Sequence, residues 1–334
     1  MSPKVSILMP VFNAAPYLED CLNSILSQGY ANWELIAVND HSTDGSDLLL
    51  ADFAEKDARI HCLTNSSKGI IPALRMAYAH AKGDFIHRMD ADDLMPAQKL
   101  EHMTAAIKKA GKGHLVTGKV KYFSSEGIGE GYEKYQNWLN ELCDSNRHWI
   151  EIYKECVIAS PCWMVHREDL EACGAFQEDR YPEDYDLVFR FYAQRLKVVS
   201  LPNVLHLWRD HAQRSSRIQE HYKENTFFDL KVHYFLKLEQ QSYRTLIIWG
   251  AGRKGKLLAR ILKSKGMDYQ WVSNNPLKEG KDIYGTLLED YSKIVQKDNP
   301  QILITVAQKD AKIEINRFMQ ENKLIEHRDF YFFS

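Results

Sequence analysis

The stretch DFIHRMDADD, residues 84–93, decides the fold, because an apolar run ends there at three carboxylates. Residues 84–89 are predicted to form a buried strand, which Asp90, Asp92 and Asp93 follow at once. Three carboxylates within four residues repel one another unless a cation lies among them. Mg²⁺ or Mn²⁺ suits such a group, since these ions take one or two carboxylates and complete their shell with water and phosphate oxygens. The alternative interpretation is an aspartate-rich helix cap.

The first ninety residues alternate short apolar runs with helical patterns, which predicts a parallel sheet with crossover helices in an α/β fold. We expect strands at residues 5–9, 33–38, 60–63 and 84–89, and helices after Pro16, before Phe53 and over 71–81. Polar loops follow these strands. Because open α/β sheets bind ligands outside the carboxyl ends of their strands, the loops are expected to converge on one site.

Composition sets further limits on function. The 334 residues include 43 Lys and Arg against 45 Asp and Glu, a net charge of -2 that argues against a nucleic-acid partner. The six cysteines form no CxxC pair, so neither a zinc site nor a disulfide framework is expected, and a reducing cytoplasm fits best. No apolar run is long enough for a signal peptide or a spanning helix. Any membrane contact is therefore expected to be peripheral.

Three motifs occur together in the order and spacing of one enzyme family. They are PVFN at 10–13, ELIAVNDHSTDGS at 34–46 and GDFIHRMDADD at 83–93. In these motifs the chain resembles family 2 glycosyltransferases with the GT-A fold, over roughly residues 4–217. The resemblance implies transfer of a sugar from a nucleotide-diphosphate donor to an acceptor hydroxyl, with inversion at the anomeric carbon.

The same resemblance implies donor-side roles for individual residues. The loop after the first strand would cradle the base, and Asp40 would hydrogen-bond a uracil ring, which favours a UDP-sugar, although Asn39 stands where many members carry Asp. Asp92 is expected to contact Mn²⁺ or Mg²⁺ directly, and Asp90 to contact the ribose or the metal's water shell. The predicted donor-binding residues are Pro10, Val11, Phe12, Asn13, Asp40, Lys68, Asp90, Arg209 and His211.

A second acidic group, YPEDYD at 181–186, precedes the apolar helical pattern of 187–195. An acidic helix cap is one interpretation, because acids are favoured in a first helical turn. The resemblance implies instead that Asp184 is the general base that removes the acceptor's proton. Residues predicted to bind the acceptor are Trp163, Met164 and Glu183, with a buried core tryptophan as the alternative for Trp163.

The segment WRDH at 208–211, with the basic residues up to Arg217, resembles the family's segment that closes over the pyrophosphate. Arg209 and His211 would supply positive charge where the leaving group becomes negative. A solvated basic loop is the competing interpretation.

The C-terminal part contains GAGRKG at 250–255, between a predicted strand and a predicted helix. This is the context of a dinucleotide fingerprint, but the next strand ends in SNN at 273–275, without the acid that binds the ribose. We therefore expect a small Rossmann-like module in which the glycines allow close packing or an anion at the helix start. Formation of a homodimer, acceptor placement and binding of a nucleotide-like regulator remain open as its role.

The sequence thus predicts a GT-A domain over residues 1–217, a connecting helix over 218–242 and a Rossmann-like domain over 243–334. We expect a cytoplasmic hexosyltransferase, peripheral at the inner face of the membrane, that takes a nucleotide-sugar donor and a saccharide or lipid-linked acceptor in surface polysaccharide or glycolipid synthesis. Two alternatives remain: a nucleotide-sugar oxidoreductase that uses the C-terminal GxGxxG, and an inert nucleotide-sugar-binding module.

Overall fold

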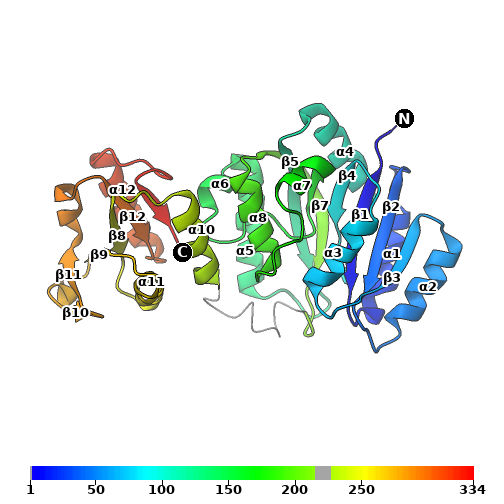
Figure 1. The fold of residues 1–334 in the computed structure, drawn as a ribbon, viewed down its shortest axis with the longest axis horizontal. Coiled ribbons are helices and arrows are strands. Elements are labelled where there is room, and N and C mark those ends of the chain that lie inside the picture. Colours follow the sequence, from blue (N-terminus) through cyan, green and yellow to red (C-terminus); the bar gives the residue numbers. More distant parts are fainter. Residues whose placement is uncertain (1, 215–226) are drawn as a thin grey trace. The chain divides into compact units, whose positions relative to one another are not determined.

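The computed structural model describes residues 2–214 and 227–334, which divide into two compact units (Figure 1). Residues 2–148 and 157–214 form the first unit, and residues 149–156 pack with 227–334 in the second. The short segment joins the second unit because the Tyr153 ring stacks on Phe333, with 5.3 Å between ring centroids. A single domain boundary at residue 217 leaves residues 149–156 in the first domain, although they pack with the second unit. No sequence pattern indicates this contact.

The first unit is built on a sheet whose strands, within the described residues, run in the order β3-β2-β1-β4-β6-β5-β7. Neighbours are parallel except on both sides of β6, which is antiparallel to β4 and β5. The strand bounds are β1 Val5–Val11, β2 Trp33–Asn39, β3 Ile60–Thr64, β4 Phe85–Arg88, β5 His114–Phe123, β6 Trp163–His166 and β7 Lys197–Arg209.

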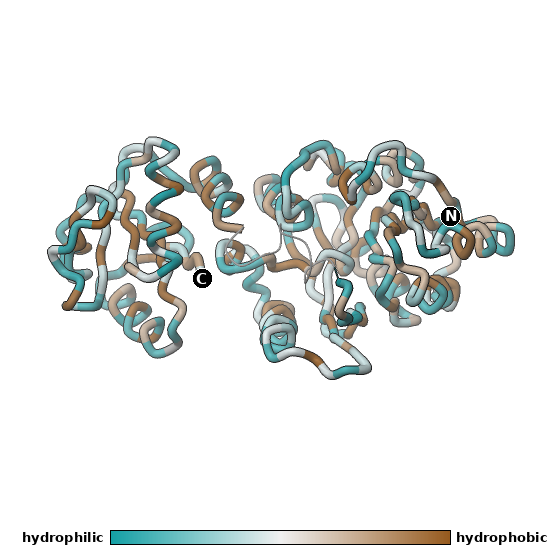
Figure 2. Tube along the Cα trace, turned by 90° about the horizontal axis from the view of Figure 1, so that it is seen from below, coloured by the Kyte–Doolittle hydropathy of each residue, from teal (hydrophilic) through white to brown (hydrophobic). Residues whose placement is uncertain are grey.

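Helices cover the faces of this sheet and bury their apolar stripes against it. In α1, for example, Leu18, Leu22 and Ile25 recur at helical spacing and are all buried. Figure 2 shows the apolar positions collected along the strands and the inward sides of the helices. The helices are α1 Ala15–Leu26, α2 Ser46–Lys56, α3 Ile70–His80, α4 Lys99–Ala110, α5 Glu130–Ser145, α7 Arg167–Ala172 and α8 Glu183–Ala193. A further helix, α6 His148–Glu151, lies almost wholly in the segment that packs with the second unit.

The second unit has its own sheet, in the order β10-β11-β9-β8-β12-β13, parallel apart from the β10–β11 hairpin. Its strands are β8 Thr245–Trp249, β9 Gln270–Ser273, β10 Asp282–Ile283, β11 Thr286–Asp290, β12 Pro300–Ile304 and β13 Phe330–Phe332. Its helices are α10 Phe227–Leu238, α11 Arg253–Ser264 and α12 Lys309–Glu321, with 3-10 turns η2 Pro276–Lys278 and η3 Tyr291–Gln296.

The predicted elements shift in three places. β1 continues through Pro10 and Val11, because both residues pair with β2, so the strand does not end at Met9. The helix predicted from residue 187 begins at Glu183, which places the acidic group inside its first turn. Of the helix predicted over 218–241, residues 218–226 lie outside the described residues, and α10 accounts for the rest.

None of the helices among the described residues combines the length and apolar character that crossing a membrane requires.

The glycine-rich loop of the second unit serves close packing. A Cβ added at Gly255 would lie 1.9 Å from the Gly250 carbonyl oxygen, whereas one added at Gly131 in α5 would meet no atom within 4 Å. We therefore expect Gly255→Ala to destabilise the protein by about 1–3 kcal/mol through overpacking. Gly131→Ala should be neutral or stabilise by up to about 1 kcal/mol, since alanine favours helix. Urea unfolding of both variants tests this, and equal midpoints would refute it.

Candidate active site

The loops after β1 and β2 meet at the carboxyl edge of the first sheet. The Asn13 backbone N–H donates to Ser42 Oγ at 3.0 Å, and the Thr43 N–H donates back to Asn13 Oδ1 at 2.8 Å. The Asp40 N–H donates to the Val11 carbonyl at 2.7 Å. These bonds join the motifs at 10–13 and 34–46 into one surface.

Asp40 lies buried at this edge with its carboxylate held in place. Asn65 Nδ2 donates to Oδ1 at 2.7 Å, and the Gly69 N–H lies 2.9 Å from both oxygens. Sequence analysis assigned Asp40 but missed these two partners, which orient it. Beside it the Phe12 ring is half exposed, and Lys68 Nζ stands 5.5 Å from the ring centroid. Val11 is buried, so only its backbone faces this surface.

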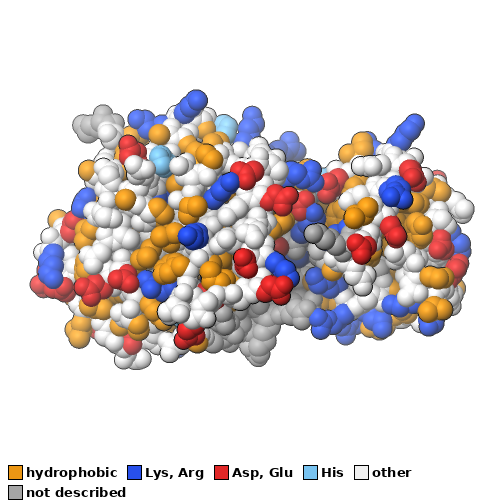
Figure 3. All heavy atoms as spheres, turned by 180° about the vertical axis from the view of Figure 1, so that it is seen from behind, with side chains coloured by type: hydrophobic (Ala, Val, Ile, Leu, Met, Phe, Trp, Pro, Cys, Tyr) orange, Lys and Arg blue, Asp and Glu red, His pale blue; other side chains and the backbone are white. Residues whose placement is uncertain are grey.

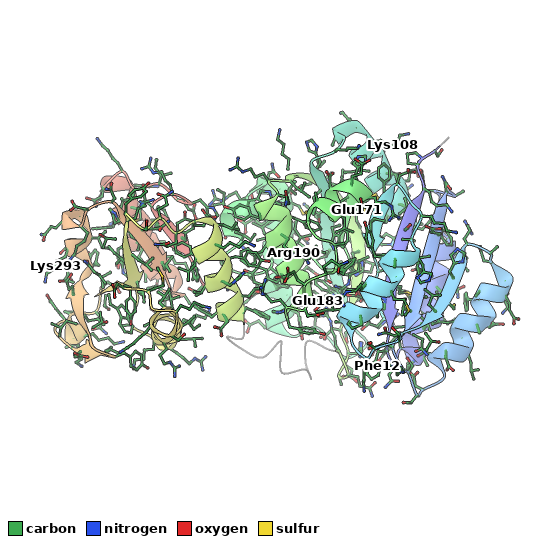
Figure 4. All side chains as sticks on the ribbon, viewed as in Figure 1. Phe12, Lys108, Glu171, Glu183, Arg190 and Lys293 are labelled. Atoms are coloured by element: carbon green, nitrogen blue, oxygen red, sulfur yellow. The ribbon has the colours of Figure 1, made fainter. Side chains whose placement is uncertain are left out.

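A buried guanidinium connects the two acidic motifs. Arg88, at the end of β4, donates through Nε to Asp90 Oδ1 at 2.9 Å and through Nη1 to Glu183 Oε1 at 3.1 Å. Its side chain is 5% exposed, as is that of Glu183. In Figure 4 Glu183 and Phe12 lie toward the lower edge of the first unit, with Lys108 at the upper edge. The carboxylates at 90 and 183 therefore belong to one site.

Asp184 follows Glu183 in the first turn of α8. Burial raises the pKa of Asp184 to about 7, the Glu183 carboxylate adds to this increase, and Arg88 opposes it. A carboxylate with a pKa near neutrality can accept a proton at physiological pH and hold it. The helix-cap interpretation also fits this position, since Asp184 Oδ1 accepts from the Tyr185 N–H at 2.8 Å in the first turn of α8.

Asp92 and His211 face each other across the same edge. His211 Nε2 lies 2.9 Å from Asp92 Oδ2. That separation fits two neighbouring ligands at about 2.1 Å from one octahedral ion. No group of three potential His, Cys, Asp or Glu ligands occurs in the described part of the chain, so water and phosphate oxygens would complete such a shell.

Asp93 points away from this pair and is buried. His206 Nε2 lies 2.9 Å from its Oδ2, and the Arg209 N–H donates to its Oδ1 at 2.7 Å. Burial raises the pKa of Asp93, with the charges of Asp92 and Asp90 adding to the increase. Lys99 stands behind His206, 3.3 Å from Nδ1, and burial lowers the pKa of this lysine to about 8. Asp93 therefore anchors β7 to the loop of residues 90–93, which we call the acidic loop.

The three carboxylates at 90–93 thus have three different partners in this structure, Arg88, His211 and His206. The prediction that Asp92 and Asp90 serve a divalent ion did not include Asp93, whose carboxylate is instead held by His206 and the Arg209 N–H. Its position cannot be read from sequence, since Asp92 and Asp93 are adjacent in the chain but differ in partner and in burial.

The segment after β7 returns to the acidic loop. Arg209 Nε donates to the Asp92 carbonyl at 2.8 Å, and its Nη2 donates to Asp20 at 3.1 Å. The Arg214 guanidinium is buried against Trp208, 4.6 Å from the ring centroid. Arg217 lies outside the described residues. The interpretation of 209–214 as a solvated basic loop is therefore incorrect for Arg209 and Arg214.

β6 begins beside the carboxyl end of β4, but the side chains of Trp163 and Met164 are not exposed there. Both side chains are buried in the core, where Trp163 meets Phe191 edge-on at 5.6 Å between centroids. The predicted acceptor contact of these two side chains is wrong, because neither side chain is exposed to a ligand. Glu183 remains a predicted acceptor-side residue.

A cavity of about 700 Å³ lies away from this site, near the amino end of β4, and none of the predicted site residues line it.

Comparison with known proteins decides the family. The model of glycosyl transferase family 2 matches residues 6–174, half of the chain. The chain is a family 2 glycosyltransferase. Glycosyltransferase GlyG of Streptococcus pneumoniae is 28% identical over 69% of this chain and 76% of its own length. UDP-Glc:alpha-D-GlcNAc-diphosphoundecaprenol beta-1,3-glucosyltransferase WfgD of Escherichia coli is 40% identical, over 31% of this chain and 41% of WfgD.

Solved structures place this glycosyltransferase in the GT-A fold. Staphylococcus aureus TarS 1–349 in complex with UDP-GlcNAc matches with a TM-score of 0.57 and 17% identity, over 78% of this chain and 71% of TarS. A mannosyltransferase from Pyrobaculum calidifontis, solved with GDP-Man and Mn²⁺, gives 0.52 and 22% identity, over 71% of this chain and 64% of that one. The appended second unit is not assigned by the family model, which ends at residue 174.

The buried ion pair of Arg88 should dominate the stability of this site. We expect Arg88→Met to destabilise the protein by about 3 kcal/mol, since it removes the guanidinium from two buried or half-buried carboxylates. Lys112→Met, which removes a surface pair with Glu168, should cost at most about 1 kcal/mol. Urea unfolding measures both, and a similar small loss for each would show that the Arg88 pairs contribute little.

Proposed function

We propose that this glycosyltransferase transfers a sugar from a UDP-sugar to an acceptor hydroxyl with inversion at the anomeric carbon. The observation that carries the proposal is the Asp90–Arg88–Glu183 chain, which sets the acidic loop beside an Asp184 whose pKa is about 7. A single displacement at the anomeric carbon needs groups that bind the donor and a base, with a pKa near neutrality, beside them. The acidic loop and Asp184 would supply these at one edge of the sheet.

In the proposed reaction Asp184 accepts the proton of the acceptor hydroxyl as its oxygen attacks the anomeric carbon. The bond from that carbon to the diphosphate oxygen breaks on the opposite face, so the configuration inverts. Arg209 and His211, which both contact Asp92, are proposed to face the negative charge that develops on the leaving diphosphate. A divalent ion held by Asp92 and His211 would supply further charge neutralisation there.

For the donor, Asp40 is the proposed partner of the uracil ring, with Phe12, Asn13 and Lys68 around it. A UDP-sugar is favoured because relatives named above act on UDP-Glc or were solved with UDP-GlcNAc. The proposed acceptor is a saccharide or a lipid-linked saccharide in surface polysaccharide or glycolipid synthesis, as the name of WfgD indicates for that enzyme. We further propose a cytoplasmic site of action at the inner face of a membrane.

No observation favours the oxidoreductase alternative. Asn275, in the loop after β9, caps η2 with its side chain, and no carboxylate occupies residues 273–275 where a ribose would bind.

The base is tested by pH and by substitution. We expect Asp184→Asn to lower transfer by about 10²–10⁴-fold while the Kd for UDP-sugar stays unchanged, because only proton removal is lost. Since the unprotonated carboxylate is the active form, the wild-type rate should rise with pH through about 7 and then level off. Initial rates between pH 5.5 and 8.5 measure this. Asp179→Asn, an exposed carboxylate, is the control. Undiminished turnover by Asp184→Asn would remove it from the base role.

The donor and the metal are tested together by release of nucleoside diphosphate. We expect release from a UDP-sugar in the presence of Mn²⁺, its loss on adding EDTA, and a loss of about 100-fold or more in Asp92→Asn. Asp52→Asn, on the exposed face of α2, should behave as wild type. Metal-independent release would contradict the role of Asp92, and release of pyrophosphate would indicate nucleotidyl transfer instead.

A further inference from the structure

Helix α11 of the second unit has an unusually one-sided charge. It carries five basic residues and no acidic one. Gly255, Leu258, Ala259, Ile261 and Leu262 are buried against the unit. Arg253, Lys256, Arg260 and Lys263 are exposed, and their spacing of three, four and three residues places them along one stripe of the helix. We call these four residues the basic stripe.

The basic stripe is costly for the helix itself. Like charges at i,i+3 and i,i+4 repel, and basic residues at a helix start oppose the helix dipole. Among the residues that the structure describes, neither Lys256 nor Arg260 has a carboxylate within ion-pair distance. The stability of the helix therefore does not explain this arrangement. A negatively charged partner would reduce the repulsion between the basic side chains.

Charge is also unevenly distributed along the chain. Residues 227–334 contain 18 Lys and Arg against 13 Asp and Glu, although the whole chain contains 43 against 45. Figure 3 shows Lys and Arg side chains gathered along the lower edge of the second unit. The positive surface is thus a property of this unit and not of the protein as a whole.

Exposed apolar side chains stand at both ends of the basic stripe. Leu277 is 79% exposed, and the neighbouring Lys278 donates from Nζ to the Ala251 carbonyl at 2.9 Å, which fixes η2 beside the start of α11. Tyr284 is 39% exposed, and its carbonyl accepts from Lys263 Nζ at 2.7 Å near the end of α11. Basic side chains combined with exposed leucine and tyrosine suit the headgroup region of a bilayer.

We propose that the basic stripe, with Leu277 and Tyr284 beside it, docks the second unit on a membrane surface of anionic phospholipid. Nucleic acid would match the charge but would leave the exposed leucine without a partner. The inference extends the proposed location at a membrane face. It does not depend on glycosyl transfer, because docking is measured without any substrate.

The test is sedimentation of the full chain with two kinds of vesicle. One is phosphatidylcholine alone, and the other contains about 30% phosphatidylglycerol to supply an anionic surface. We expect binding only to the anionic vesicles, and loss of binding at 0.5 M salt, at roughly a 4 Å Debye length. Lys256→Gln with Arg260→Gln should weaken binding by about 10- to 30-fold. Lys108→Gln with Lys109→Gln, which removes the same charge from exposed positions of α4, should change it less than about twofold.

Three outcomes would overturn the proposal. They are absence of wild-type binding to anionic vesicles, equal weakening by the two double variants, and tight binding of a single-stranded oligonucleotide by a chain that ignores the vesicles. Circular dichroism confirms that each variant is folded. Leu277→Ser provides a second measure, since loss of the apolar contact should weaken vesicle binding but leave its salt dependence in place.

Discussion

A buried guanidinium holds the candidate active site of this glycosyltransferase together. Arg88 ends β4 inside the sheet, where removing a charge from water is expensive, and two carboxylates offset that cost. One of them, Asp90, belongs to the loop that follows β4, and the other, Glu183, begins α8. The start of α8, and with it Asp184, is therefore held beside the acidic loop by a contact between residues 95 positions apart.

The same contact affects the pKa of Asp184, the proposed base. Burial and the Glu183 carboxylate raise the pKa of Asp184, while Arg88 limits the increase, so the group stays near neutrality. The arrangement thus connects a structural ion pair with the protonation state that the proposed base requires.

The carboxylates of the acidic loop have different surroundings. Asp92 faces His211 at the open edge, and Asp93 turns inward to His206 and the backbone of Arg209. The inward contact fixes the end of β7, from which the chain continues to His211. Asp93 therefore helps to place the histidine that Asp92 faces, although it does not reach the open edge itself.

Local sequence determined much of this protein. Apolar runs followed by polar loops indicated the strands of the first sheet, and the joint motifs at 10–13, 34–46 and 83–93 indicated the GT-A family, because short-range pattern and turn chemistry are encoded in neighbouring residues. Only the tertiary structure decided which side chains face the site. Trp163 looked like an acceptor contact and lies in the core, Arg88 looked like part of a strand and joins two motifs, and Asp93 points away from its neighbour. Such directions depend on which strands pair and which helix covers them, and those contacts form between residues that are distant in the chain.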